Sequence, residues 1–151
     1  MLQHGSCAAR DGAGVLLLGP PGSGKSDLVL RLTGAGWRLV ADDQVLLRAE
    51  GDAVRAAAPE RLRGMIEVRG LGILEGFEAE PETALSLVVD CVPRADVPRL
   101  PRPARWEALG RSLPRIALHA TEASAPRKIA LALDALAGRV TLRAGALEAA
   151  P

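Results

Sequence analysis

The sequence predicts an α/β domain in which a mixed, strand-rich sheet surrounds one helix near the N-terminus and one C-terminal helix. Apolar runs of strand length recur along the chain and are separated by glycine, proline and aspartate turns. Only two segments, 25–34 and 125–137, carry a helical pattern with stop signals at the end. The apolar run VLLLG at 15–19 enters a glycine-rich loop that leads directly into the first helix.

The first half of the chain is expected to alternate short strands with turns around one helix. The run at 15–19 is apolar throughout, as in strands that are covered on both faces. The helix should be largely buried and should end at Gly34 and Gly36. In order, the expected elements are strand 2–9, turn 10–14, strand 15–19, helix 25–34, strand 37–43, strand 44–52 and strand 53–58.

The second half is expected to contain four more strands, a long loop and the last helix. The segment 93–105 carries four prolines and four arginines and therefore predicts a loop. Ser124 is expected to cap the last helix, and Gly138 lies just past its end. In order, the expected elements are a helical turn at 58–64, strand 65–68, strand 84–92, loop 93–105, strands 106–109 and 113–120, and helix 125–137.

Composition argues against nucleic-acid binding. The net charge is +1, whereas nucleic-acid-binding domains usually have a marked basic excess. The aromatic residues are limited to Trp37, Phe77 and Trp106, so stacking platforms for single strands are nearly absent. Cys7 and Cys91 fit no metal or redox spacing and are expected to be reduced, buried thiols.

Length and hydropathy predict one cytoplasmic domain. No stretch approaches the length of a membrane-spanning helix, and the N-terminus lacks the apolar core of a signal peptide. We therefore expect no membrane partner. The domain is expected to cover residues 1–138, and 139–151 should form a weakly structured tail.

The loop after the strand at 15–19 has the pattern of a phosphate-binding P-loop. Gly19, Gly24, Lys25 and Ser26 match G-x-x-x-x-G-K-[ST], between a strand and a helix as that motif requires. Backbone N–H groups and the helix N-terminus would bind phosphates, Lys25 would reach the β- and γ-phosphates, and Ser26 would bind Mg²⁺. The alternative is a glycine-rich turn without a ligand. The expected nucleotide-binding residues are Gly19, Pro20, Pro21, Gly22, Ser23, Gly24, Lys25 and Ser26.

Two acidic residues end the strand that follows the first helix. Because consecutive strand residues face opposite sides, we expect only one of Asp42 and Asp43 to point at the phosphates. A carboxylate there would hold magnesium or accept a proton from an attacking hydroxyl. An acidic turn between two strands is the alternative.

A carboxylate and a guanidinium alternate with apolar residues at 65–69. Glu67 and Arg69 are expected to share one strand face, where they would suit a metal and a phosphate, and Gly70 begins a flexible stretch. A solvated cross-strand ion pair would produce the same pattern. His4 is, by periodicity alone, a structural histidine.

Four segments together resemble the catalytic domain of bacterial HPr kinase/phosphorylase. They are HG at 4–5, GPPGSGKS at 19–26, LVADDQV at 39–45 and EVRGLGIL at 67–74. The glycine loop is shared with many families, whereas its combination with A-D-D and E-x-R-G-L-G is specific to this one. The similarity runs from about residue 4 to 119, and more faintly to 137, and implies a P-loop kinase-like fold.

The resemblance implies roles for individual residues. Lys25 corresponds to the phosphate-binding lysine, and Ser26 and Glu67 to magnesium ligands. Asp43 corresponds to the general base of phosphorylation, and His4 to a histidine that positions it. Arg99, in VPRLP, aligns with an active-site arginine of the family.

The same resemblance implies an enzyme that uses ATP and Mg²⁺ to phosphorylate a serine of the phosphocarrier HPr or a paralogue. Family members also reverse this reaction with inorganic phosphate and release pyrophosphate. The segment 116–128 departs from the one used for that reversal, although Arg127 and Lys128 could substitute. The family also implies a homo-oligomer, a hexamer in its members, and this chain resembles a short form without the N-terminal domain.

Two other function classes use the same P-loop. A small-molecule kinase would apply the Lys25, Mg²⁺ and Asp43 chemistry to a metabolite hydroxyl, with the loop 93–105 as the only candidate lid. A non-catalytic, nucleotide-dependent switch would keep Asp43 as a structural residue. A labelled phosphoryl group from ATP distinguishes the three functions. It appears on a carrier serine for the carrier kinase, on a metabolite for the small-molecule kinase, and on neither for the switch.

Overall fold

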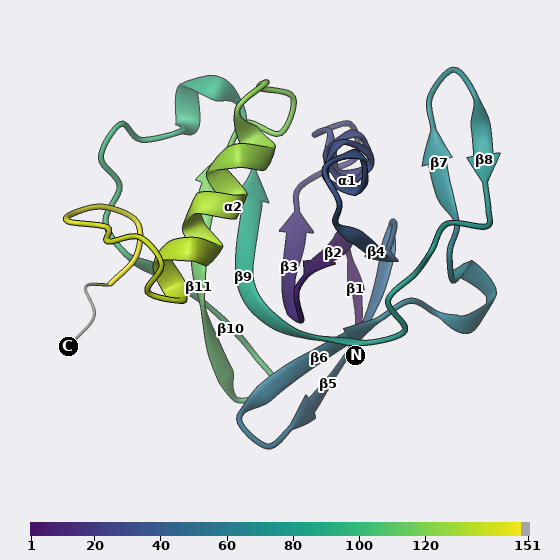
Figure 1. The fold of residues 1–151 in the computed structure, drawn as a ribbon, viewed down its shortest axis with the longest axis horizontal. Helices are drawn as coiled ribbons and strands as arrows, with labels where there is room; N and C mark the ends of the chain where they lie inside the picture. The colour runs from purple at the N-terminus through teal and green to yellow at the C-terminus, as the bar shows by residue number, and fades with distance from the viewer. Residues whose placement is uncertain (149–151) are drawn as a thin grey trace.

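The computed structural model describes residues 1–148, and its strands and helices agree with the predicted α/β class (Figure 1). The tail at 139–148 contains no helix or strand, and residues 149–151 of the predicted tail lie outside the described residues. In order, the elements are β1 (Leu2–His4), β2 (Ser6–Arg10), β3 (Ala13–Leu18), α1 (Lys25–Gly34), β4 (Arg38–Ala41), β5 (Gln44–Glu50), β6 (Ala53–Ala57), the 3₁₀ helix η1 (Glu60–Leu62), β7 (Ile66–Val68), β8 (Gly72–Leu74), β9 (Thr83–Cys91), η2 (Arg94–Asp96), β10 (Ala104–Ala108), β11 (Arg111–Leu118) and α2 (Ala125–Leu136).

Nine strands form one mixed sheet. The order is β1-β5-β6-β9-β3-β2-β4, and β11 pairs with β9 and with β10. Strands β3, β9 and β11 run parallel, so their carboxyl ends meet at the same edge of the sheet. Ligands of open α/β sheets bind outside this edge. The remaining two strands, β7 and β8, form a separate hairpin that projects beside α1 (Figure 1).

Strand β3 is buried on both faces, as its apolar run predicts. Val15 and Leu17 belong to the core that lies beneath the two helices, and Leu16 belongs to a second core on the other face. Both helices cover the first face (Figure 1), and the second core contains residues of β5, β6 and β10. The rigid strand therefore fixes the start of the glycine loop from both sides.

Several local expectations differ from the structure. The strand expected at 2–9 is divided at Gly5, where a Cβ would lie 2.7 Å from the carbonyl oxygen of Leu17. Strand β8 was not predicted, because Gly70 and Gly72 indicate a flexible segment. Helix α1 buries only one side, through Leu28, Val29 and Leu32. Ser124 occupies the N-cap position of α2, but its side chain makes no capping hydrogen bond.

The two cysteines are free and buried, as predicted. Burial raises the pKa of the Cys7 thiol to about 12 and that of the Cys91 thiol to about 11. Both thiols are therefore protonated at neutral pH and act as small apolar core side chains. Within residues 1–148, neither helix has the length and hydropathy needed to cross a membrane.

Candidate functional site

The glycine loop between β3 and α1 has the conformation of an anion-binding loop. Gly22 and Gly24 have φ values of 82° and 95°, a region that favours glycine, and Gly24 is the N-cap of α1. The Lys25 Nζ donates to the carbonyl oxygens of Gly19 at 2.6 Å and Pro20 at 3.1 Å. The ammonium group thus lies over the loop, where a triphosphate would meet it.

Close packing around the loop also requires glycine. A Cβ on Gly19 would lie 2.5 Å from Ser23 Oγ and 3.0 Å from the Cys91 carbonyl oxygen. A Cβ on Gly24 would lie 3.0 Å from Thr121 Cγ2. Ser23 Oγ is the one buried side-chain oxygen or nitrogen without a hydrogen-bond partner in the described residues. Such unsatisfied groups are rare in folded proteins, and a bound ligand is one of the partners that explain them.

Asp42 connects the loop to two other segments. Its Oδ1 accepts hydrogen bonds from Ser26 Oγ at 2.7 Å and from Ser6 Oγ at 2.9 Å. Its Oδ2 accepts one from the backbone N–H of Glu67 at 3.2 Å. The Asp42 residue is only 7% exposed. This carboxylate therefore joins α1, β2 and β7 at the side of the P-loop.

The pair Asp42 and Ser26 fits a magnesium ion. Mg²⁺ in nucleotide sites is held by one or two carboxylates, waters and substrate phosphates, and in P-loop proteins by the loop hydroxyl and an aspartate. Ser26 and Asp42 supply these two oxygen donors in direct contact. No group of three or more His, Cys, Asp and Glu side chains suited to a metal occurs in residues 1–148. Substrate phosphates and waters would complete the ligands of an ion held by this pair.

Asp43 lies beside this pair but faces solvent. The two aspartates form a bend between β4 and β5 rather than the end of a strand, and they diverge as expected, one buried and one exposed. Asp43 has φ 69°, a conformation that aspartate tolerates better than most residues. Its carbonyl oxygen accepts from Gly5 N–H at 3.1 Å, and its own N–H donates to Ser6 Oγ at 3.4 Å. The alternative of a purely acidic turn does not account for the contact between Asp42 and the P-loop.

The hairpin β7–β8 contributes a backbone group rather than an ion pair. Strand β7 ends at Val68, so Arg69 and Gly70 lie in the turn and the interpretation that Glu67 and Arg69 share a strand face is wrong. Both side chains are exposed, and within residues 1–148 neither forms an ion pair. The Glu67 N–H donates to Asp42 Oδ2, which places the backbone of Glu67 beside the pair of Asp42 and Ser26.

His4 and Arg99 were predicted at the site from resemblance. His4 ends β1 opposite Gln44, the residue after Asp43, and is exposed. Its ring makes no hydrogen bond within the described residues, which does not support a structural histidine. Arg99 is exposed in the loop between η2 and β10, and its side chain makes no hydrogen bond or ion pair within the described part of the chain.

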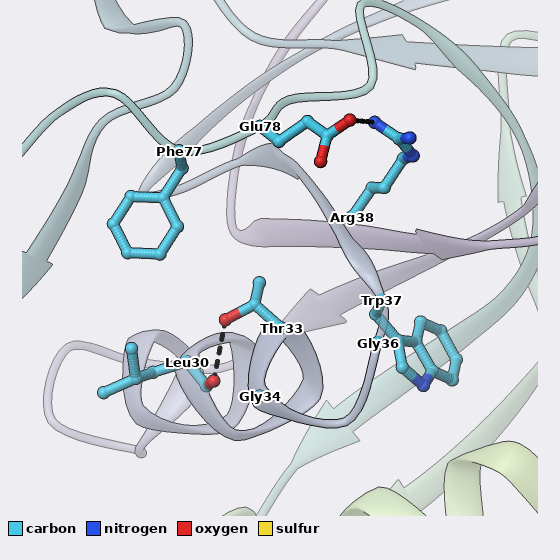
Figure 2. A pocket seen from close by; sticks show the side chains of 8 residues that line it. All are labelled: Leu30, Thr33, Gly34, Gly36, Trp37, Arg38, Phe77 and Glu78. Atoms are coloured by element: carbon cyan, nitrogen blue, oxygen red, sulfur yellow. Dashed lines mark hydrogen bonds and ion pairs between the residues drawn. The ribbon is translucent and has the colours of Figure 1, made fainter.

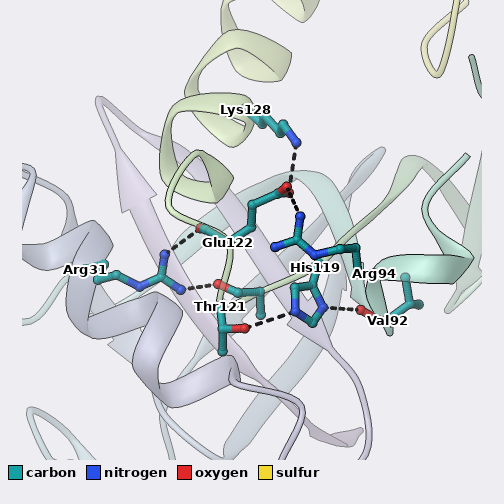
Figure 3. A network of polar contacts seen from close by, with 8 residues as sticks. Arg31, Val92, Arg94, His119, Thr121, Glu122 and Lys128 are labelled. Atoms are coloured by element: carbon teal, nitrogen blue, oxygen red, sulfur yellow. Dashed lines mark hydrogen bonds and ion pairs between the residues drawn. The ribbon is translucent and has the colours of Figure 1, made fainter. Parts of the chain in front are cut away.

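Sequence reasoning missed a polar network on the other side of the P-loop (Figure 3). Arg31 of α1 donates to the carbonyl oxygens of Ala120 and Glu122. The Glu122 carboxylate accepts from Arg94 at 3.1 Å and from Lys128 at 2.9 Å. The pKa of the Glu122 carboxyl group is lowered, and the hydrogen bond from Lys128 is the largest cause. Ser6 was also missed, because a serine in a strand carries no motif.

A cavity of about 520 Å³ lies away from this chemistry (Figure 2). It is at the C-terminal end of α1, whereas the P-loop is at the N-terminal end. Arg38 and Glu78 form an ion pair of 2.7 Å at its wall. The residues of the P-loop and the aspartate pair do not line it. Its lining residues are Leu30, Thr33, Gly34, Gly36, Trp37, Arg38, Phe77 and Glu78.

Comparison with known proteins gives a consistent family. The model of the HPr serine kinase C-terminal domain matches residues 1–145. A protein named HPr kinase/phosphorylase from Cupriavidus metallidurans is 36% identical over 142 residues, which cover 87% of this chain and 43% of that relative. One of the same name from Caldanaerobacter subterraneus is 51% identical over 73 residues, 48% of this chain and 24% of that relative. The chain spans from about a quarter to about half the length of the curated relatives it matches.

A solved structure supports the fold. The HPr(Ser) kinase/phosphatase of Coxiella burnetii superposes with a TM-score of 0.81 and 24% identity. The match covers 92% of this chain and 97% of that chain.

Proposed function

The chain belongs to the HPr serine kinase C-terminal domain family, and we propose that it transfers the γ-phosphoryl group of ATP to a serine of a small HPr-like phosphocarrier. The observation that carries this proposal is the contact of 2.7 Å between Ser26 Oγ and the Asp42 carboxylate. Next to this contact, the exposed Asp43 carboxylate is open to an incoming hydroxyl. One carboxylate can thus serve the metal while the other serves the acceptor.

The proposed reaction is an in-line displacement. The serine oxygen of the carrier forms a bond to the γ-phosphorus as the bond between that phosphorus and the bridging oxygen of ADP breaks. Asp43 accepts the hydroxyl proton, and ADP leaves with the bond electrons. Lys25 and the loop N–H groups stabilise the phosphate charge. Ser26, Asp42 and Glu67 would hold Mg²⁺, which would supply positive charge against the phosphate oxygens.

His4 is proposed as a positioning residue for Asp43. His4 of β1 is paired with Gln44 of β5, the residue after Asp43. The residue after His4, Gly5, donates its N–H to the Asp43 carbonyl oxygen. The family also leads us to propose a cytoplasmic enzyme that forms homo-oligomers.

A labelled-phosphate assay tests the proposed function. The chain is incubated with [γ-³²P]ATP, Mg²⁺ and a purified HPr-like carrier, and separately with a metabolite extract. We expect label on the carrier only. Label on a metabolite would indicate a small-molecule kinase, and ATP binding without transfer would indicate a nucleotide-dependent switch.

Replacing Arg99 with alanine is expected to lower transfer to the carrier about ten- to hundredfold, the value of one charged hydrogen bond. ATP affinity should stay nearly constant, because within the described residues the Arg99 side chain makes no hydrogen bond or ion pair with the P-loop. Transfer rate and nucleotide affinity are measured separately. Arg102→Ala, in the same exposed loop, is the matched control and should cause only a salt-dependent weakening of carrier docking. A transfer rate of Arg99→Ala equal to that of the wild type would show that Arg99 has no role in the reaction and that the loop only connects η2 to β10.

The reverse reaction is expected to be slow. Lys128, which could replace the basic residues of the family segment, is paired with Glu122 at 2.9 Å, so inorganic phosphate would have to compete with a carboxylate. Pyrophosphate release from phosphorylated carrier and inorganic phosphate measures this direction. Release as fast as the forward transfer would contradict the expectation.

A further inference from the structure

The loop that follows β11 stands directly beside the P-loop. Gly24 is in such close contact with it that a Cβ there would lie 3.0 Å from Thr121 Cγ2 and 3.2 Å from Ala120 Cβ. Strand β11 is parallel to β9, and β9 is parallel to β3, so this loop and the P-loop leave the same edge of the sheet. We call residues 119–124 the β11–α2 loop. It lies on the opposite side of the P-loop from the β7–β8 hairpin (Figure 1).

The β11–α2 loop is held by three different elements (Figure 3). Arg31 binds two of its carbonyl oxygens from α1. Glu122 binds Arg94 of η2 and Lys128 of α2. Such anchoring gives the loop one conformation before any ligand arrives, which reduces the entropy cost of binding.

His119 is fixed with one tautomer in this loop. Its Nδ1 lies 3.0 Å from the Val92 carbonyl oxygen, and its Nε2 lies 3.1 Å from Thr121 Oγ1. A carbonyl oxygen only accepts, so Nδ1 donates, and in this tautomer Nε2 accepts from Thr121 Oγ1. The ring edges are therefore occupied, whereas the lone pairs of Thr121 Oγ1 stay available to a further donor.

The direction of the reaction determines which part of ATP reaches this loop. In an in-line displacement, the leaving ADP is opposite the attacking hydroxyl. The hydroxyl approaches from Asp43, on the side of Asp42 and Glu67. With the hydroxyl on that side, the proposed reaction directs the nucleoside to the other side of the P-loop, where the β11–α2 loop lies (Figure 1).

We propose that His119 and Thr121 form the wall of a nucleoside subsite, in which the imidazole face stacks on the base and Thr121 Oγ1 accepts from a ribose hydroxyl. This inference rests on the proposed function. The subsite recognises the face of any base and the ribose, and it does not select one base by hydrogen bonds to its edge. Residues 119–121 have no amide or carboxylate side chain for such hydrogen bonds. Trp37 and Trp106 are buried, so they cannot supply the stacking surface.

Calorimetric titration of the full chain with ATP and with inorganic tripolyphosphate, both with Mg²⁺, tests the subsite. We expect the wild type to bind ATP more tightly than tripolyphosphate. His119→Ala should weaken ATP binding about tenfold, as for loss of one base-stacking ring, and leave tripolyphosphate binding unchanged. His119→Phe, which keeps a ring and loses both hydrogen bonds, should retain most of the ATP affinity.

A purely structural role of His119 would give a different pattern. Loosening of the loop would disturb the packing on Gly24 and weaken both ligands alike, and this result would overturn the subsite. Unchanged ATP binding by His119→Ala would also overturn it. Arg105→Ala, on the β10–β11 hairpin, is the control. Failure of the wild type to bind ATP at all would instead contradict the proposed function, and the subsite with it.

Discussion

Lys25→Ala is expected to abolish phosphoryl transfer and to weaken ATP binding about ten- to hundredfold, the value of one or more lost charged hydrogen bonds. The triphosphate loses its main counter-charge in this variant. The fold should persist, because the Nζ hydrogen bonds of Lys25 are to two loop carbonyl oxygens, of Gly19 and Pro20. ATP affinity, transfer rate and far-UV circular dichroism are the three measurements.

The control removes one positive charge elsewhere. Arg105→Ala changes an exposed side chain that bonds Ser112 within the β10–β11 hairpin, and it should behave as the wild type. Retained transfer by Lys25→Ala would remove the basis of the phosphate-site assignment. Loss of the dichroism signal would show that the lysine also stabilises the fold.

Asp43→Asn is expected to lower transfer by about 10²–10⁴, the usual contribution of a general base, with ATP affinity within a few-fold of wild type. The asparagine keeps the size of the side chain and the φ of 69°. It cannot accept the hydroxyl proton. Single-turnover transfer and equilibrium ATP binding separate the two effects.

Asp42→Asn is the matched variant at the neighbouring position. On the sequence alone it would be the milder change, but the structure gives the Asp42 carboxylate three hydrogen bonds, including that of Ser26. We therefore expect a strong loss of transfer, a raised Mg²⁺ requirement for ATP binding and a lower unfolding temperature. Asp43→Asn should change neither the Mg²⁺ requirement nor the unfolding temperature. Identical profiles of the two variants would show that the roles are assigned wrongly.

The P-loop could be predicted because all its determinants are local. An apolar strand, glycines at the turns and the Lys25–Ser26 pair at the helix start follow one another in the sequence, and helix α1 begins and ends where predicted. The burial of β3 on both faces was also predicted, since a continuous apolar run indicates a strand that is covered on both faces.

The partners of the P-loop could not be predicted from local patterns. Ser6 and Asp42 are 36 positions apart, and their hydrogen bond exists only because β2 lies between β3 and β4. Ala120 and Thr121 reach Gly24 through the parallel pairing of β11 with β9. Such contacts depend on strand order, which alternation of polar and apolar residues does not determine.

At the hairpin β7–β8, a local pattern was present in the sequence but was interpreted wrongly. Alternation at 65–69 indicated that Glu67 and Arg69 share a strand face, but the strand ends at Val68, and Gly70, with φ 92°, lies in the turn that follows. Arg69 therefore lies outside the strand that carries Glu67. The group of Glu67 that contacts Asp42 is its backbone N–H, not its carboxylate.

Mass spectrometry of the carrier tests the central claim most directly. A purified HPr-like carrier is incubated with ATP, Mg²⁺ and either wild type or Asp43→Asn, and fragmentation locates any added phosphoryl group. We predict one phosphoryl group on one serine with the wild type and a far slower gain with Asp43→Asn. An unmodified carrier after prolonged incubation with a wild-type chain that binds ATP would contradict the claim that this chain is a serine kinase of such carriers.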